Sequence, residues 1–369
     1  MLPRVRAWLQ WPLLIVAIFA GGEIAARLDD LVRYDVPFLA PLDVGYDLTV
    51  RDSTTIRGRP FGRFKKVRLN AAGFRGPTVT PVARAGCIRV AVLGASESVV
   101  GGEAAGTEYP ALMQRALDGR GCFEVQNAAL SGFDLPHLTV LWNQWVARWS
   151  PALVVVYTTP AFYLRPDAPT YPEPPTGRAR KPKWWTPRLE DRAPGEWSLP
   201  EVIQKWIARR DIDRAVAAHD AGWEYQEVPA DRLARYQRDL DSLVVAIRGA
   251  GAEPILVTHA MRFADPMRPS DELELLKWQR GTRATGPVVL DFERAANAAM
   301  LALGHRRGVM VVDAAARLTG RQEWFVDYIH FTVPGRAVMG ALLADSVAAL
   351  AGRHPPTRAL SDRVSRSSR

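Results

Sequence analysis

The sequence predicts a three-layer α/β/α sandwich built on a mainly parallel sheet of five strands. From residue 86 onward, short apolar runs alternate with longer stretches of helical periodicity, the order expected of repeated strand–helix–strand units. Several of the short runs are almost continuous in apolar and β-branched residues. Such runs are typical of strands that helices cover on both faces.

Five strands and six helices can be placed from these patterns. The expected strands cover residues 89–93, 123–125, 153–157, 254–258 and 309–312. The expected helices cover residues 109–117, 137–147, 199–217, 231–248, 288–303 and 334–351. Asp231 is the expected N-cap of the fourth helix, and Gly249-Ala250-Gly251 is its expected end.

The composition is that of an ordinary globular protein. The chain has 369 residues, of which 48% are apolar and 24% charged, and this excludes wholesale disorder. The net charge is +9, with local enrichment of basic residues at 178–183 and 353–369. Such charge could suit nucleic acid, anionic lipid or an acidic glycan. No zinc-finger spacing or RNA-recognition signature accompanies it, so we expect a solvated basic surface and no nucleic-acid partner.

The N-terminal segment is expected to attach the chain to the inner membrane. Arg4 and Arg6 precede a mostly apolar stretch from residue 7 to 22, and helical character continues to residue 28. Its length lies between a signal-peptide core of about 7–15 residues and a membrane span of about 20. Cleavage near Ala20 or Gly22 and a buried soluble helix are the alternatives, but the continuing helix favours an uncleaved anchor. The basic flank then predicts a single-pass protein whose main domain is periplasmic.

Four parts of the chain follow from these patterns. Residues 1–28 form the anchor or signal segment, and residues 29–85 a linker whose short strands pack on the main domain. Residues 86–352 form the α/β domain, and residues 353–369 a basic disordered tail. Within the domain, residues 160–228 contain many prolines and tryptophans and interrupt the alternation of strands and helices. We therefore expect an insertion that packs beside the site. A subdomain that only packs is the alternative.

Two cysteines begin neighbouring predicted strands. Cys87 precedes the first strand and Cys122 the second. If these strands are parallel neighbours, their first residues are adjacent, as a disulfide requires. The bond would suit an exported protein and would contribute about 3–4 kcal/mol through loop closure. Two unrelated buried thiols are the alternative.

Three residues are candidates for nucleophilic chemistry. Ser96 follows the first expected strand, at the carboxyl edge of the sheet where ligands gather. Taken alone, a serine that caps the next helix is an equal alternative. Asp327 and His330 lie three residues apart, just before the last expected helix. A serine nucleophile needs a base to accept its proton, and the base needs a carboxylate to fix its tautomer, so these three residues could act together.

These motifs, taken in order, resemble those of the SGNH/GDSL hydrolases. The family has a Gly-Asp-Ser turn after the first strand, a glycine in a second block, an Asn in a third, and an Asp-x-x-His near the end. The matching residues here are Gly94-Ala95-Ser96, Asn127-Ala128-Ala129-Leu130-Ser131-Gly132 and Asp327-Tyr328-Ile329-His330. Residues 69–76 and 109–112 also resemble membrane-anchored family members. The resemblance spans about residues 69–352 and implies a flavodoxin-like sheet.

The resemblance implies a role for each matched residue. Ser96 would be the nucleophile, His330 the general base and acid, and Asp327 the residue that orients His330. The backbone N–H groups of Ser96 and Gly132 would receive the oxyanion.

The chain departs from the family pattern at two positions. Ala95 stands where the family has Asp, and the third-block Asn falls at or near Ala161. Losing one oxyanion donor can reduce the rate by about 10²–10³. Thr158 or Thr159 could donate instead.

Other polar residues are weaker candidates for a catalytic role. His259 follows the fourth expected strand, and we expect it to line the site or serve the structure. Glu97 could face substrate or simply begin the helix. The remaining histidines show no ligand spacing, and no phosphate loop or dinucleotide fingerprint is present, so we expect neither metal nor cofactor. These histidines are His137, His219, His305 and His354.

The resemblance and the expected export together imply an extracytoplasmic serine ester hydrolase or O-acyltransferase. Its substrate would be an acylated carbohydrate of the cell envelope, with acetyl as the typical group, or another ester. A membrane acyltransferase is a possible partner. The alternative, motivated by Ala95 and Ala161, is a degenerate SGNH-fold protein that binds or assembles components for polysaccharide modification.

Overall fold

The apolar runs form one parallel sheet in the computed structural model, which describes residues 3–34, 38, 48–51, 56–64, 67–78, 80–99, 106–166 and 200–352. The strands are β5 (Ile88–Gly94), β6 (Phe123–Asn127), β7 (Leu153–Tyr157), β8 (Glu253–Val257) and β9 (Met310–Val312). Their order is β6-β5-β7-β8-β9, and each neighbouring pair is parallel. The predicted five-stranded sheet is confirmed, with the doubly wound, flavodoxin-like strand order.

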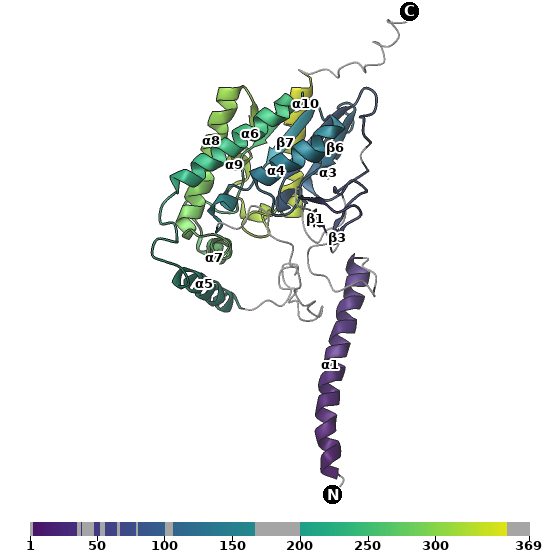
Figure 1. Cartoon of the computed structure of the whole chain (residues 1–369), viewed down its shortest axis with the longest axis vertical. Helices are drawn as coiled ribbons and strands as arrows, with labels where there is room; N and C mark the ends of the chain where they lie inside the picture. The colour runs from purple at the N-terminus through teal and green to yellow at the C-terminus, as the bar shows by residue number, and fades with distance from the viewer. Residues whose placement is uncertain are drawn as a thin grey trace, which may run out of the picture.

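Helices cover both faces of this sheet (Figure 1). Every residue of β7 is buried, because successive side chains point to opposite faces and both faces are packed. One face packs on α4, α6 and α8, and the other on α3 and α10. The bounds are α3 (Tyr109–Leu117), α4 (Leu135–Leu141), α6 (Ala230–Gly249), α8 (Gly286–Arg307) and α10 (Val333–Ala351). The predicted α/β/α sandwich is therefore confirmed.

Two helices begin earlier than the sequence patterns predicted. The N-cap of α6 is Pro229 and the helix begins at Ala230, so the prediction that Asp231 is the cap is wrong. Asp231 lies in the first turn, where a carboxylate interacts favourably with the helix dipole. α4 begins at Leu135 and continues into a π-helical turn, η1 (Trp142–Val146), and a 3₁₀ turn, η2 (Ala147–Trp149).

The connections after the strands carry the remaining short elements. They are α2 (Ser96–Val99), η3 (Pro160–Leu164), η6 (Pro269–Asp271), α7 (Glu272–Gln279), α9 (Ala314–Leu318) and η7 (Gln322–Trp324). The sequence patterns did not predict α7, which packs against α5 (Glu201–Ala217). α5 belongs to the expected insertion, whose central part, residues 167–199, lies outside the described residues, as does the expected tail of residues 353–369.

Two small hairpins precede the main sheet. β1 (Thr49–Arg51) pairs with β2 (Ile56–Gly58), and β3 (Arg63–Phe64) with β4 (Val67–Arg68), both antiparallel. Val67, Leu69 and Phe74 are buried in the same core as α4 and α6. This part of the expected linker is thus packed on the α/β domain.

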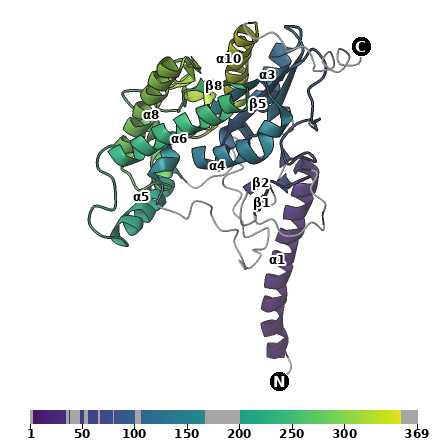
Figure 2. The ribbon, with the colours of Figure 1, turned by 45° about the horizontal axis from the view of Figure 1, so that its top comes forward.

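The N-terminal helix α1 (Pro3–Tyr34) stands away from the domain in both views (Figures 1 and 2). Its large apolar side chains from Trp11 to Phe19 are exposed. Among the described residues, α10 is the one helix long and apolar enough to cross a membrane, whereas α1 contributes a shorter apolar stretch, Trp11–Ala25. α10 packs on the sheet and on α3, so its apolar character is that of a core helix.

A disulfide joins Cys87 and Cys122, whose Cα atoms lie 4.4 Å apart. β5 and β6 are parallel neighbours in which Ile88 is opposite Phe123, so the two cysteines precede matched positions. The bond ties together the amino ends of two strands, at the edge opposite the candidate site.

Candidate active site

Ser96 lies at the carboxyl end of β5, where the strand turns into α2. The turn is tight, since a Cβ on Gly94 would collide with the Ser98 hydroxyl. Ala95 is fully buried, whereas Ser96 is partly exposed. The nucleophile candidate thus stands at the edge of the sheet with its side chain open to the site.

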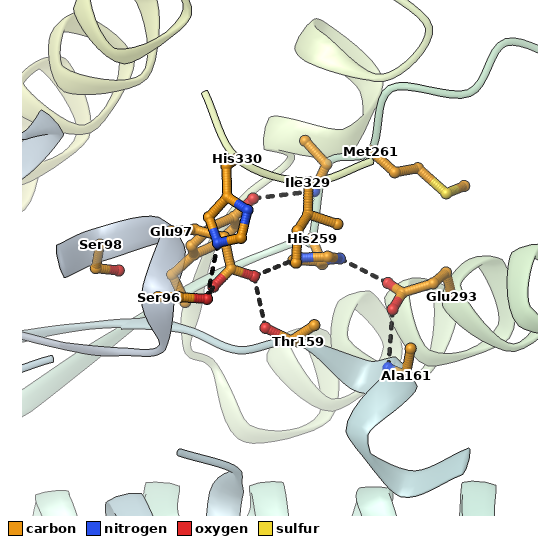
Figure 3. A network of polar contacts seen from close by, with 12 residues as sticks. Ser96, Glu97, Ser98, Thr159, Ala161, His259, Met261, Glu293, Ile329 and His330 are labelled. Atoms are coloured by element: carbon orange, nitrogen blue, oxygen red, sulfur yellow. Dashed lines mark hydrogen bonds and ion pairs between the residues drawn. The ribbon is translucent and has the colours of Figure 1, made fainter. Parts of the chain in front are cut away.

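Asp327 and His330 lie in the loop that leads into α10. One carboxylate oxygen of Asp327, Oδ1, accepts the backbone N–H groups of Ile329 and His330 at 2.9 and 2.8 Å, which folds the loop back on itself. The other oxygen, Oδ2, lies 2.7 Å from His330 Nδ1. His330 Nε2 lies 2.9 Å from Ser96 Oγ (Figure 3). The structure therefore brings together all three residues that the sequence singled out.

These distances assign the tautomer of His330. A carboxylate can only accept a hydrogen bond, so Nδ1–H donates to Asp327 Oδ2, and Nε2 is free to accept a hydrogen bond from the Ser96 hydroxyl. Burial lowers the pKa of His330, but the Asp327 carboxylate and the charge of Glu97 outweigh it, so the pKa lies above its ordinary value. For Asp327, burial raises the pKa, and His330 together with two backbone N–H groups lowers it further than burial raises it.

A second polar network lies beside Ser96 (Figure 3). Glu97 Oε1 accepts the Thr159 hydroxyl at 2.6 Å and lies 3.1 Å from His259 Nε2. His259 Nδ1 lies 2.7 Å from Glu293 Oε2, and Glu293 Oε1 accepts the Ala161 N–H at 2.8 Å. The network thus joins four segments of the fold: the turn after β5, the segment after β7, the segment after β8 and helix α8.

The ring of His259 carries a proton on each nitrogen. Both nitrogens face carboxylate oxygens, and a neutral imidazole has only one N–H to donate. Burial alone would lower the pKa of His259, but Glu293 and Glu97 raise it to about 10. Burial would raise the pKa of Glu97, but His259, His330 and Thr159 lower it to about 2. A buried imidazolium therefore lies between two buried carboxylates.

The predicted oxyanion donors have different environments. Gly132 is exposed and has a φ of +80°, a conformation that glycine adopts without strain. Within the described part of the chain, neither the Ser96 nor the Gly132 amide donates a hydrogen bond. Both backbone N–H groups are thus candidate donors to an oxyanion.

The structure does not place a side-chain donor at the position of the family Asn. Ala161 is buried and its N–H is used by Glu293. The Thr159 hydroxyl donates to Glu97 in this structure, and its role as a substitute oxyanion donor stays a prediction. Thr158 is buried near the Tyr236 phenol, on the side of the sheet that packs on α6.

Sequence reasoning missed the buried network. It placed Glu97 and His259 at the correct edge but assigned them no joint role, and it did not single out Glu293. The available signal was a carboxylate within the apolar stretch of α8, where Val289, Phe292 and Ala296 are fully buried. A buried charge on such a face needs a partner.

Comparison with known proteins gives only a distant likeness, and it is to solved structures. No protein-family model and no curated protein matches the chain. A lipase/acylhydrolase from Enterococcus faecalis is 15% identical, with 71% of this chain and 96% of that chain covered and a TM-score of 0.40. A GDSL-like lipase from Bacteroides thetaiotaomicron is 12% identical, with 70% and 87% covered and a TM-score of 0.39. An acetyl xylan esterase from Geobacillus stearothermophilus is 13% identical, with 70% and 94% covered and a TM-score of 0.42.

These similarities concern the fold alone. The sheet order and the α/β/α layers are those that the SGNH/GDSL resemblance implied. The case for chemistry rests on the positions of Ser96, His330 and Asp327 in this chain.

Proposed function

We propose that this protein is a serine ester hydrolase or acyltransferase of SGNH type. The observation that carries the proposal is the continuous chain of contacts from Ser96 Oγ through His330 to Asp327, at 2.9 and 2.7 Å. Such a set is the arrangement that activates a serine hydroxyl. Its place at the carboxyl edge of a parallel sheet is where a substrate would bind.

The reaction follows from the proton positions. His330 Nε2 takes the Ser96 proton as Oγ attacks the ester carbonyl, and Asp327 stabilises the imidazolium through Nδ1–H. The N–H groups of Ser96 and Gly132 receive the oxyanion. Collapse returns the proton to the leaving alcohol and leaves an acyl group on Ser96. Water or a sugar hydroxyl, deprotonated by His330, then takes the acyl group and restores the serine.

We propose an O-acylated carbohydrate of the cell envelope as substrate, with acetyl as the acyl group. An exposed apolar helix, α1, supports attachment to the inner membrane, with the domain on its outer side. Release of acetate in water alone indicates hydrolysis, and acetylated product with an added oligosaccharide indicates transfer.

Labelling with a fluorophosphonate probe tests the proposal. The probe reacts with activated serines, so the full-length chain in detergent should be labelled and Ser96→Ala should not. Ser346→Ala is the matched control, because the Ser346 hydroxyl donates to the backbone carbonyl of Leu342 within α10 and not to a histidine. It should be labelled as wild type is. Equal labelling of wild type and Ser96→Ala would rule out Ser96 as the nucleophile.

A binding or assembly protein on the same fold is the second candidate. It is favoured by the lack of a side-chain donor at buried Ala161, whose N–H is already used by Glu293. An unlabelled Ser96 in a folded wild-type chain, together with retention of the chain on an acetylated glycan resin, would favour this function over catalysis.

A further inference from the structure

We propose that Glu97 is a second carboxylate that positions the Ser96–His330 pair, and that the buried His259–Glu293 pair holds it there in its ionised form. The inference deepens the proposed serine chemistry, and its effect on the reaction rate rests on that proposed function. The effect of Glu97 on the pKa of His330 can be measured without turnover.

The first argument is the position of Glu97 on the reacting hydroxyl. Ser96 Oγ lies 3.3 Å from Glu97 Oε2 as well as 2.9 Å from His330 Nε2. Ser96 has one proton to donate. When His330 is neutral, Nε2 accepts that proton; when His330 is protonated, Nε2–H donates to Oγ and the hydroxyl proton turns to Glu97. Glu97 therefore offers the serine a partner in the state in which His330 is charged.

The second argument concerns the charge that develops during attack. Once the serine proton is on His330, the imidazolium is flanked by two carboxylates, Asp327 on Nδ1–H and Glu97 on the far side of Oγ. Opposite charges within about 4–6 Å favour the charged form of an ionisable group. Glu97 thus stabilises the same species that Asp327 stabilises, from a different direction.

The third argument is that Glu97 needs help to stay ionised. Its side chain is 1% exposed, and a buried carboxylate without partners takes up a proton. His259 supplies a positive charge at 3.1 Å, and Glu293 in turn stabilises that charge at 2.7 Å. Asn297 fixes the backbone of His259 from both sides, accepting its N–H at 2.7 Å and donating to its carbonyl at 2.8 Å. Together these contacts hold the Glu97 carboxylate in one position.

The charged groups around His330 come from four elements. Asp327 lies on its own loop, Glu97 on α2 and His259 at the end of β8. Arg165, after η3, acts on Glu97 and on Tyr328, the neighbour of His330. The carboxylates raise the pKa of His330 and His259 lowers it, so removing the Glu97 charge should lower it.

Nuclear magnetic resonance titration of the full-length chain in detergent micelles, with ¹⁵N-labelled histidine, tests the proposal. In Glu97→Gln, the pKa of His330 should fall by about one unit relative to wild type. Glu108→Gln is the matched control, since Glu108 is 2% exposed like Glu97 but pairs with Arg75 instead. It should leave the pKa of His330 at its wild-type value. If Glu97→Gln does not change the pKa of His330, or if Glu108→Gln lowers it equally, the proposal is overturned.

A second variant covers the case in which Glu97→Gln does not fold. Glu293→Gln keeps Glu97 but removes the far carboxylate, so His259 should lose its second proton at a lower pH than in wild type. If the His259 resonances titrate as in wild type, the pair does not act as proposed.

The rate of fluorophosphonate labelling separates this inference from the proposed function. If wild type is labelled, Glu97→Gln should be labelled up to about tenfold more slowly at the plateau of the pH profile, with its acidic limb moved to lower pH. An equal plateau and limb would overturn the inference while leaving the serine chemistry intact. If wild type is not labelled, the proposed function fails, and the His330 titration still decides whether Glu97 acts on His330.

Discussion

Two histidines meet carboxylates at the same edge of the sheet, and their surroundings give them opposite properties. The side chain of His330 is 26% exposed and lies between one carboxylate and one hydroxyl. That of His259 is fully buried and lies between two carboxylates. His330 can give and take a proton at Nε2, whereas His259 has a carboxylate oxygen facing each nitrogen and keeps both protons.

The comparison shows that partner chemistry, rather than residue type, decides what a histidine does. A hydroxyl can either donate or accept, so the Ser96–His330 contact survives a proton transfer in either direction. A carboxylate beside a buried cation only accepts, so losing a proton from His259 would leave a lone pair facing a negative charge. The first arrangement suits catalysis, and the second suits a fixed charge.

Removing the exchangeable histidine should have the largest effect on activity. His330→Gln should slow labelling of Ser96, and turnover of an activated acetyl ester, by at least about 10³-fold, because no base remains to accept the serine proton. Because the ring is partly exposed, urea unfolding should show a loss of no more than about 1 kcal/mol. A variant that retains wild-type rates would remove His330 from the proposed mechanism.

Removing the fixed histidine should instead affect stability first. His259→Gln leaves Glu97 and Glu293 buried without the cation between them, and breaking a buried ion pair in this way costs about 3–5 kcal/mol. Urea unfolding monitored by circular dichroism measures the loss. Arg307→Gln is a control, since it removes the cation of an exposed surface pair with Asp241 and should cost much less stability than His259→Gln. Equal losses in both variants would show that the buried His259 cation contributes no more to stability than the cation of a surface pair.

The sequence predicted one half of this comparison and not the other. Ser96, Asp327 and His330 were found because their motifs are local: a serine after a strand, and an Asp-x-x-His before a helix. The fold followed from similar local signals, the apolar strands and the amphipathic helices between them. Helix starts were less predictable, as Asp231 shows, because a cap depends on backbone geometry as well as residue type.

The buried network could not be read in the same way. Glu97 and His259 are 162 residues apart, and His259 and Glu293 are 34 apart. The strand order β5-β7-β8, together with the packing of α8 on the sheet, brings them into contact. The missing side-chain donor at Ala161 was visible from the sequence, but the use of Thr159 by Glu97 depends on that same three-dimensional arrangement.

The pH dependence of the rate should reflect the exchangeable histidine. His330 must be unprotonated to act as a base, and its pKa is raised above the ordinary 6.5 by Asp327 and Glu97 against the effect of burial. The labelling rate should therefore fall as pH drops through a value above 6.5, by about tenfold for each further unit. Asp327→Asn should move this limb to lower pH as well as slow the reaction. A limb below 6.5 in wild type would contradict the assigned environment.

The pH dependence of stability should reflect the fixed histidine, with a smaller effect. The folded-state pKa of His259 is raised from 6.5 to about 10, so its contribution is fully present below 6.5 and is lost as pH rises toward about 10. The pKa of Glu97 is lowered from 4.5 to about 2, so its contribution is present above 4.5 and is lost as pH falls through about 2. The network should therefore stabilise most between about 4.5 and 6.5. Urea unfolding at pH 6 and pH 9 should show that wild type loses stability between these pH values, and that His259→Gln loses less. If the free energy of unfolding falls equally in the two proteins, His259 is not the charged residue that the network requires.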